Sequence, residues 1–423
     1  MPSIKKNFAY KSALTLSTYI MAFITFPYVS RILGVEKLGL VNYVDNTVSY
    51  FLLFASMGIN YLGVREIASV RDNKKERDKT FSDLLGMNIS FTVIILVIYF
   101  VLFLTIPKFN QYSELFFIGA AKILFTAFLI EWFFTGIEDF KYITIRSLII
   151  KIIYVVLVFT LVKTECDYKL YFILTIATVV INALINIIYV RKFVSFDFNC
   201  IFKFKKIIQN ITLGIYNILG STYLTFNVMY LGLATDNTQV GYYTTAFKIY
   251  SVILGFFSAF TNVMLPRMSS LLANGEKEQF SELINKSFKA MCTFSIPLML
   301  CSIVLAPQLI YVISGNGYQG AIIPMRIIMP AILMVGIAQV LAVQILMPLK
   351  KDKILFFASL TGAIVSLAVN ITIVYKLGSI GSAIVLLSCE TVVTSFYIIF
   401  VKYWQKINID YYLLYHLLGH ILL

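Results

Sequence analysis

Several ionisable side chains lie inside long apolar stretches of this chain, where they could bind a charged ligand or exchange an ion. Lys151 and Lys248 are the deepest cations, Lys122 is intermediate, and Lys11 lies nearer the end of its stretch. A charged side chain at the centre of a bilayer costs at least about 2.5–3.5 kcal/mol, so it needs a partner or a function. Lys151 and Lys248 lie too deep to reach the membrane surface easily. We therefore expect both to face an internal cavity.

Asp45, Glu131 and Glu390 are the carboxylates in the same kind of surrounding. A carboxyl group in an apolar site can exchange a proton near neutral pH, which suits ion-coupled transport. Asp45 and Lys248 take nearly equivalent positions in two halves of a weak repeat, so they could face each other across one cavity. A fixed ion pair that only joins two helices is the alternative. Because the buried cations outnumber the carboxylates, such a cavity is expected to attract an anionic cargo.

No pattern in the sequence is typical of a catalytic, metal or cofactor site. The phosphate-binding pattern G-x-x-x-x-G-K-[ST] is absent, so ATP hydrolysis is not expected. Residues 315–320 match G-x-G-x-x-G but follow an apolar helix instead of a strand, so they do not predict a nucleotide site. His416 and His420 lack the glutamate and the third ligand of a zinc site. The five Cys are scattered and predict no disulfide framework.

The composition requires lipid as the main solvent of this chain. Of 423 residues, 59% are hydrophobic and 13% are charged, whereas soluble domains carry about 25% charged residues. The net charge of +14 comes from Lys and Arg clusters between apolar runs, which encode membrane topology and do not indicate nucleic-acid binding. The sequence therefore predicts an all-α integral membrane protein that contacts membrane lipids.

Twelve apolar runs are long enough to cross about 30 Å of hydrocarbon. They are residues 8–33, 38–64, 81–106, 115–137, 142–162, 170–190, 207–233, 240–265, 287–313, 325–347, 354–375 and 381–401. The connections on one side hold 24 Lys and Arg, with Arg146 counted among them, and those on the other side hold 7. Positive residues favour the cytoplasmic side, so both termini are expected in the cytoplasm.

The expected domains are two bundles of six helices, in residues 1–190 and 207–401. A basic linker at 191–206 joins them, and an interfacial or cytoplasmic tail follows at 402–423. A weak repeat supports this division, because Gly39 and Arg65 recur as Gly241 and Arg267 at the same offset. Halves of six helices with the same orientation form a parallel repeat, which is typical of transporters.

Several motifs resemble the Wzx-type polysaccharide repeat-unit flippases of the multidrug/oligosaccharidyl-lipid/polysaccharide exporter superfamily. The most specific stretch is Trp-Phe-x-x-Gly-x-Glu-Asp-Phe at residues 132–140. Others are residues 26–34 with Gly39, residues 57–68, Leu-Pro-Arg at 265–267 and the run at 348–353. The matches follow the family's order through most of the chain.

This resemblance implies a fold like that of the multidrug exporters of this superfamily, with alternating access through a cationic central cavity. The implied cargo is an undecaprenyl-diphosphate-linked oligosaccharide for O-antigen, capsule or another surface polysaccharide, moved across the bacterial inner membrane. On that basis, the candidates for binding the diphosphate or acidic sugars are Arg31, Lys122, Lys151, Lys248 and Arg326. The candidates for coupling to H⁺ or Na⁺ are Asp45, Glu131 and Glu390. Polysaccharide-assembly enzymes are plausible partners.

Two other functions fit part of the sequence. A drug/cation antiporter of the same superfamily would favour an acidic cavity, whereas the deep charges here lean basic. A polysaccharide polymerase or acyltransferase would be expected to show a large polar catalytic loop or a histidine within the membrane.

Overall fold

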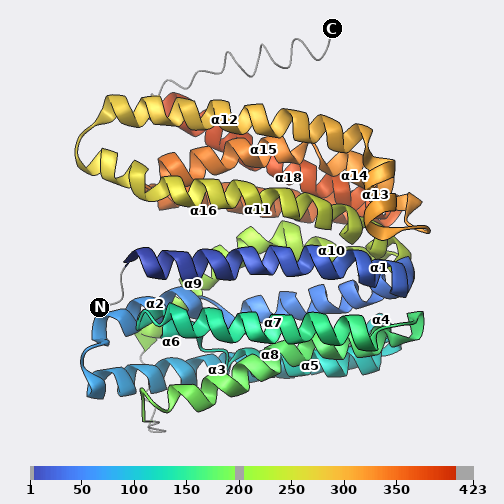
Figure 1. Ribbon diagram of the computed structural model, residues 1–423, viewed down its shortest axis with the longest axis horizontal. Helices are drawn as coiled ribbons and strands as arrows, with labels where there is room; N and C mark the ends of the chain where they lie inside the picture. Colours follow the sequence, from blue (N-terminus) through green and yellow to red (C-terminus); the bar gives the residue numbers. More distant parts are fainter. Residues whose placement is uncertain (1–3, 196–203, 406–423) are drawn as a thin grey trace. The chain divides into compact units, whose positions relative to one another are not determined.

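The structure of the chain, a computed structural model, describes residues 4–195 and 204–405. Every regular element in these ranges is a helix, and no strand occurs in them (Figure 1). The expected all-α fold is therefore confirmed.

The chain divides into two compact units between Ser221 and Thr222. The N-terminal unit contains α1 (Ile4–Ser56), α2 (Ile59–Val70), α3 (Lys74–Thr105), α4 (Pro107–Gln111), α5 (Ser113–Thr126), α6 (Glu131–Gly136), α7 (Phe140–Leu161), η1 (Glu165–Asp167), α8 (Tyr168–Val190) and α9 (Phe204–Ser221). The predicted domain limits at 190, 206 and 401 stay a prediction, because much of the predicted linker and tail (196–203 and 406–423) lies outside the described residues.

The C-terminal unit contains more interrupted helices than the N-terminal unit. Its elements are η2 (Thr222–Phe226), α10 (Asn227–Ala234), α11 (Asn237–Ala273), α12 (Lys277–Val304), α13 (Ala306–Ser314), η3 (Gln319–Ala321), α14 (Ile322–Ile328), α15 (Ala331–Gln339), η4 (Val340–Leu346), α16 (Asp352–Val369), η5 (Asn370–Val374), α17 (Tyr375–Leu377), α18 (Ser379–Phe400) and η6 (Val401–Gln405). Helix α18 packs against α14, α15 and α16, so it lies at the centre of this unit.

Ten helical segments among the described residues are long and apolar enough to cross a membrane. The first, Ala9–Val70, contains two of the runs found in the sequence. The run at 207–233 corresponds to α9, η2 and α10. Each of the twelve predicted runs thus has a helical counterpart, and the chain is a multi-pass membrane protein.

Gly34 separates the two membrane helices within α1. Its φ of 68° lies in the left-handed region, which glycine adopts at little cost because it has no Cβ. Figure 1 shows the chain turn back at this point, so that residues 35–56 run beside residues 4–33. This turn brings the polar residues of both parts of α1 into one unit.

The Trp-Phe-Phe stretch of α6 forms the centre of an aromatic core in the N-terminal unit. Trp132, Phe133 and Phe134 are buried, and Phe81 of α3 packs against the first two rings. Helices in lipid associate mainly through close van der Waals contact, which small residues permit. A Cβ at Gly63 of α2 would lie 2.7 Å from the Trp132 ring. The motif at 132–136 is thus explained by packing.

We expect Gly63→Ala to lower the free energy of unfolding by about 1–3 kcal/mol, because its methyl group would overpack against Trp132. Thermal unfolding of the purified chain in detergent measures the loss. Gly220→Ala is the matched control, since its Cβ would meet no atom within 4 Å. Equal melting temperatures for the two variants would contradict this account of the α2–α6 contact.

Candidate functional site

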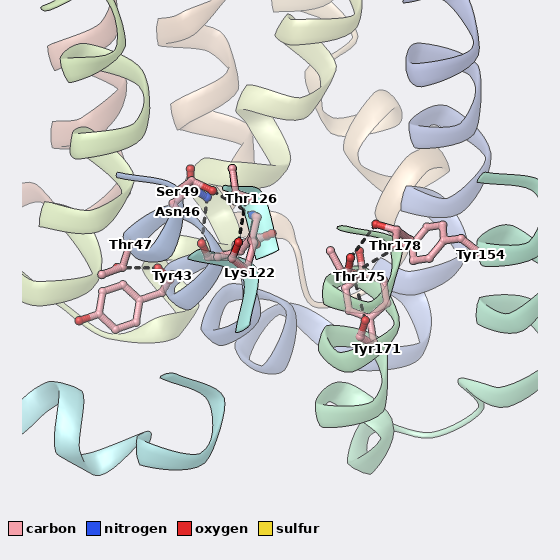
Figure 2. Close-up of polar contacts among 12 residues, drawn as sticks. Tyr43, Asn46, Thr47, Ser49, Lys122, Thr126, Tyr154, Tyr171, Thr175 and Thr178 are labelled. Atoms are coloured by element: carbon pink, nitrogen blue, oxygen red, sulfur yellow. Dashed lines mark hydrogen bonds and ion pairs between the residues drawn. The ribbon is translucent and has the colours of Figure 1, made fainter. Parts of the chain in front are cut away.

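Lys122 and Asp45 form an ion pair inside the N-terminal unit. Lys122 Nζ of α5 donates to Asp45 Oδ1 of α1 at 2.6 Å and to Ser49 Oγ at 3.0 Å. Asp45 and Ser49 are four residues apart, so the helix places both on the face toward α5. Figure 2 shows Lys122 beside Ser49 and Asn46. The Lys122 side chain is 14% exposed and that of Asp45 is 31% exposed, so the pair is only partly shielded.

This pair joins two candidates to which the sequence had assigned different roles. Lys122 was expected to bind an anionic cargo and Asp45 to exchange an ion, yet each neutralises the other. The structure thus gives Asp45 a partner on α5 that the sequence analysis did not assign to it, and its expected part in ion coupling stays a prediction. The predicted proximity of Asp45 to Lys248, which belongs to the other unit, stays a prediction.

Lys151 of α7 is held by uncharged groups of α1. Its Nζ donates to Thr18 Oγ1 at 2.7 Å, to Ser17 Oγ at 3.0 Å and to the Leu14 carbonyl at 3.4 Å. No carboxylate among the described residues forms a salt bridge with Lys151. Its positive charge is therefore hydrogen-bonded but has no directly paired counter-charge.

Glu131 is paired with an arginine that the sequence analysis did not select. Arg146 of α7 donates from Nη2 to Glu131 Oε1 at 2.6 Å, and from Nη1 to Asn186 of α8. The Arg146 side chain is 4% exposed, whereas that of Glu131 is 45% exposed. Tyr142 also donates to Asn186 Oδ1, at 2.9 Å. The count of basic residues had placed Arg146 in a connection, but it lies inside α7 as the buried centre of this group.

A stripe of polar side chains along α8 completes the interior of the N-terminal unit. Its members, three or four residues apart, are Tyr171, Thr175, Thr178, Asn182, Asn186 and Tyr189. This spacing puts them on one helix face. Tyr154 of α7 comes within hydrogen-bond distance of Thr175, with 3.4 Å between the oxygens (Figure 2). The stripe follows a helical period in the sequence. Its side chains are Tyr, Thr and Asn, so a selection based on charged residues did not include them.

The remaining candidates belong to neither the Asp45–Lys122 pair nor the Glu131–Arg146 pair. Arg31 is exposed near the end of the first helix of α1, and Arg326 of α14 is exposed and donates to the Ile303 carbonyl at 3.2 Å. Lys248 is half-buried on α11. Glu390 is buried on α18, and no hydrogen bond or ion pair joins it to another described residue. The structure therefore groups Lys122, Lys151, Asp45 and Glu131 in one unit.

The described residues hold no cluster of three or more His, Cys, Asp or Glu side chains that could bind a metal ion. His416 and His420 lie outside the described residues. Gly315 and Gly317, from the stretch that matches G-x-G-x-x-G, adopt positive φ angles in the connection between α13 and η3.

Comparisons with known proteins agree with this architecture. Residues 4–272 match the family model described as "Polysaccharide biosynthesis protein". A relative from Escherichia coli (strain K12), named "Putative O-antigen transporter", is 26% identical over 95% of this chain and 97% of its own length. The name of this relative is that of a transporter, as expected from the sequence.

Solved structures with the same fold include two transport proteins. The lipid II flippase MurJ, in an inward closed conformation, has a TM-score of 0.74 and 15% identity, over 93% of this chain and 87% of its own. An inward-facing multidrug resistance MATE family transporter of the MOP superfamily has a TM-score of 0.65 and 11% identity, over 92% and 94% of the two chains. These similarities confirm the fold expected from the sequence.

We expect Arg146→Met to lower the free energy of unfolding by about 2 kcal/mol, because it removes two charge-assisted bonds, leaves Glu131 without its donor and leaves Asn186 Oδ1 with Tyr142 alone. Arg71→Met is the matched control. Arg71 donates to Glu138 at 2.9 Å, but the two side chains are 29% and 39% exposed, and such a pair contributes about 1 kcal/mol or less. Thermal unfolding in detergent compares the variants, and a larger loss for Arg71→Met would show that burial does not decide the strength of these pairs.

Proposed function

Because the chain belongs to the polysaccharide biosynthesis protein family, we propose that it is a flippase for undecaprenyl-diphosphate-linked oligosaccharide repeat units. It moves them from the cytoplasmic to the outer leaflet of the bacterial inner membrane, with both of its own termini in the cytoplasm. The lipid-linked unit is its cargo, and enzymes that assemble or polymerise the polysaccharide are its expected partners. The name of the Escherichia coli relative and the fold shared with a lipid II flippase support this proposal.

The observation that carries the proposal is the unpaired charge of Lys151. Lys122 and Arg146 are neutralised by Asp45 and Glu131, whereas Lys151 is held only by hydroxyl and carbonyl oxygens. A cation kept in an apolar unit without a carboxylate in direct contact gains most from an anionic ligand. A diphosphate supplies that charge together with strong acceptor oxygens. We place the diphosphate at Lys151, with Lys248, Arg31 and Arg326 as further cations of a central cavity that opens to each side in turn.

Glu390 is the candidate that we favour for ion coupling. Asp45 and Glu131 already have cationic partners, but Glu390 is 7% exposed and has none among the described residues. A carboxylate buried without a counter-charge must be neutralised by a proton or a bound cation. Buried oxygens of Asn227, Asn370 and Ser382 also lack partners, and they lie on α18 itself or on elements that pack against it. H⁺ or Na⁺ bound on this side of the C-terminal unit would drive the change of access.

Depletion of the protein in cells is expected to leave the lipid-linked repeat unit on the cytoplasmic leaflet. The wild-type chain should restore export, and Lys151→Ala with Lys248→Ala should reduce it about tenfold or more, because each change removes a charged hydrogen-bond donor. Accessibility of the glycan to an external lectin or glycosidase measures the sidedness. Lys163→Ala, which removes an exposed lysine beyond the end of α7, is the control for loss of charge.

Two outcomes of that experiment would contradict the flippase. Normal export after depletion would favour the drug/cation antiporter considered from the sequence, and a multidrug resistance transporter shares the fold. Accumulation of single repeat units on the outer face would favour a polymerase.

Glu390→Gln is expected to make transport independent of the H⁺ or Na⁺ gradient, because a neutral amide needs neither ion. The measurement is glycan export at several imposed gradients, where the wild-type rate should change about tenfold and the variant rate should stay flat. Glu282→Gln is the control, since Glu282 forms an exposed pair with Lys286 at 2.6 Å on α12. A Glu390→Gln variant that responds to the gradient like the wild type would exclude Glu390 as the coupling site.

A further inference from the structure

The interior of the N-terminal unit contains a polar region with no net charge, next to Lys151. This region consists of the Asp45–Lys122 pair with Ser49 and Asn46, and of Tyr154, Tyr171 and Thr175 on α7 and α8. We propose that it is a subsite for the neutral hydroxyl groups of the first sugars of the cargo, distinct from the diphosphate position at Lys151. The inference rests on the proposed function, because it assumes a cargo that carries sugars.

Unused hydrogen-bonding groups beside the ion pair match a sugar hydroxyl. Lys122 occupies Asp45 Oδ1, but Oδ2 has no partner among the described residues. Ser49 accepts from Lys122, which leaves its own O–H proton free to donate. Asn46 donates to the Asn42 carbonyl at 2.9 Å, and no described residue donates to its Oδ1. The region thus offers two acceptors and one donor, and a hydroxyl group, which both donates and accepts, can use either kind.

The tyrosine side of the region supplies apolar surface together with the Tyr154 hydroxyl. Thr175 donates its own proton to the Tyr171 carbonyl at 3.0 Å, so the contact with Tyr154 is the weaker of the two. The Tyr154 and Thr175 oxygens are 3.4 Å apart, near the limit for a hydrogen bond, so a sugar hydroxyl could replace this contact at little cost. Each aromatic ring also has a flat apolar face and a polar tip. Helix α8, which carries Tyr171 and Thr175, packs against both α1 and α5, the two helices that hold the Asp45–Lys122 pair.

The position of the region fits a lipid whose diphosphate lies at Lys151. Tyr154 is three residues beyond Lys151 on α7, an axial rise of about 4.5 Å. A sugar attached directly to the diphosphate would therefore lie within reach of Tyr154.

Charge argues against a second diphosphate position at Lys122. Its ammonium group is already paired with Asp45 at 2.6 Å, so an incoming diphosphate would have to displace a carboxylate and leave it uncompensated. Partial exposure of both side chains is what a ligand site requires.

The test compares two lipids on the purified full-length chain in nanodiscs. One is undecaprenyl diphosphate, and the other is the same lipid carrying the oligosaccharide that accumulates in depleted cells. The dissociation constant of undecaprenyl diphosphate, divided by that of the lipid with the oligosaccharide, is a ratio that measures how much the sugars contribute to binding. Asp45→Asn with Lys122→Met removes the pair without changing the net charge, and Tyr154→Phe removes one hydroxyl and keeps the ring.

We expect the double variant to lower this ratio at least tenfold and Tyr154→Phe to lower it about threefold, in line with hydrogen bonds lost to a bound ligand. The affinity for undecaprenyl diphosphate should stay within twofold of the wild type. Lys151→Ala should weaken the binding of both lipids equally. Glu114→Gln with Lys169→Met is the matched control, because it removes an exposed Lys–Glu pair between α5 and α8.

Three results would overturn the inference. An unchanged ratio in the double variant would show that the pair does not contact sugar. Equal weakening of both lipids would place the diphosphate at Lys122. If the double variant does not fold, an unchanged ratio in Tyr154→Phe excludes the subsite on its own. Failure of the proposed function would look different, since the wild-type chain would then bind neither lipid.

Discussion

A charge inside the hydrocarbon of a bilayer has to be paired or hydrogen-bonded, and this requirement shapes the interior of the N-terminal unit. Without water as a partner, each ammonium, guanidinium or carboxylate group draws polar side chains from neighbouring helices toward it. Asp45 meets Lys122 across α1 and α5, and Arg146 joins α6 to α8 through Glu131 and Asn186. The helices that carry these groups are otherwise apolar and gain no hydrophobic energy from packing together in lipid. Polar contacts and close packing at residues such as Gly63 therefore decide how the unit is assembled.

The same requirement separates residues that hold the unit together from residues that can bind cargo. A charge with a partner of opposite sign is satisfied before any ligand arrives, and it contributes mainly to structure or to the recognition of neutral groups. Lys151 in the N-terminal unit and the buried Glu390 in the C-terminal unit have no such partner in direct contact among the described residues, and Arg326, which also has none, is exposed. Our account gives them the two tasks that need an unpaired charge, binding of a diphosphate and coupling to an ion.

The predicted features that depend on local sequence agree with the structure. Apolar runs predicted the helices, because length and hydropathy are properties of one segment. The pairing of deep charges could not be predicted, since Asp45 and Lys122 are 77 residues apart and meet only where α1 packs against α5. Arg146 was assigned to a connection because it lies near the start of its helix, and only the packing of α6, α7 and α8 shows that it is buried. The polar stripe on α8 could have been predicted from its helical period, but its side chains are uncharged and were not among the candidates.

The most direct measurement of the central claim is the transfer of an undecaprenyl-diphosphate-linked oligosaccharide across the bilayer of proteoliposomes that contain only this chain. The glycan that becomes accessible on the opposite face is followed with time, for the wild type and for Lys151→Ala. Our account predicts transfer by the wild type well above that of empty liposomes, and a loss of about tenfold in the variant. Equal rates in proteoliposomes and empty liposomes would contradict the flippase, and equal rates for the two chains would contradict the role of Lys151.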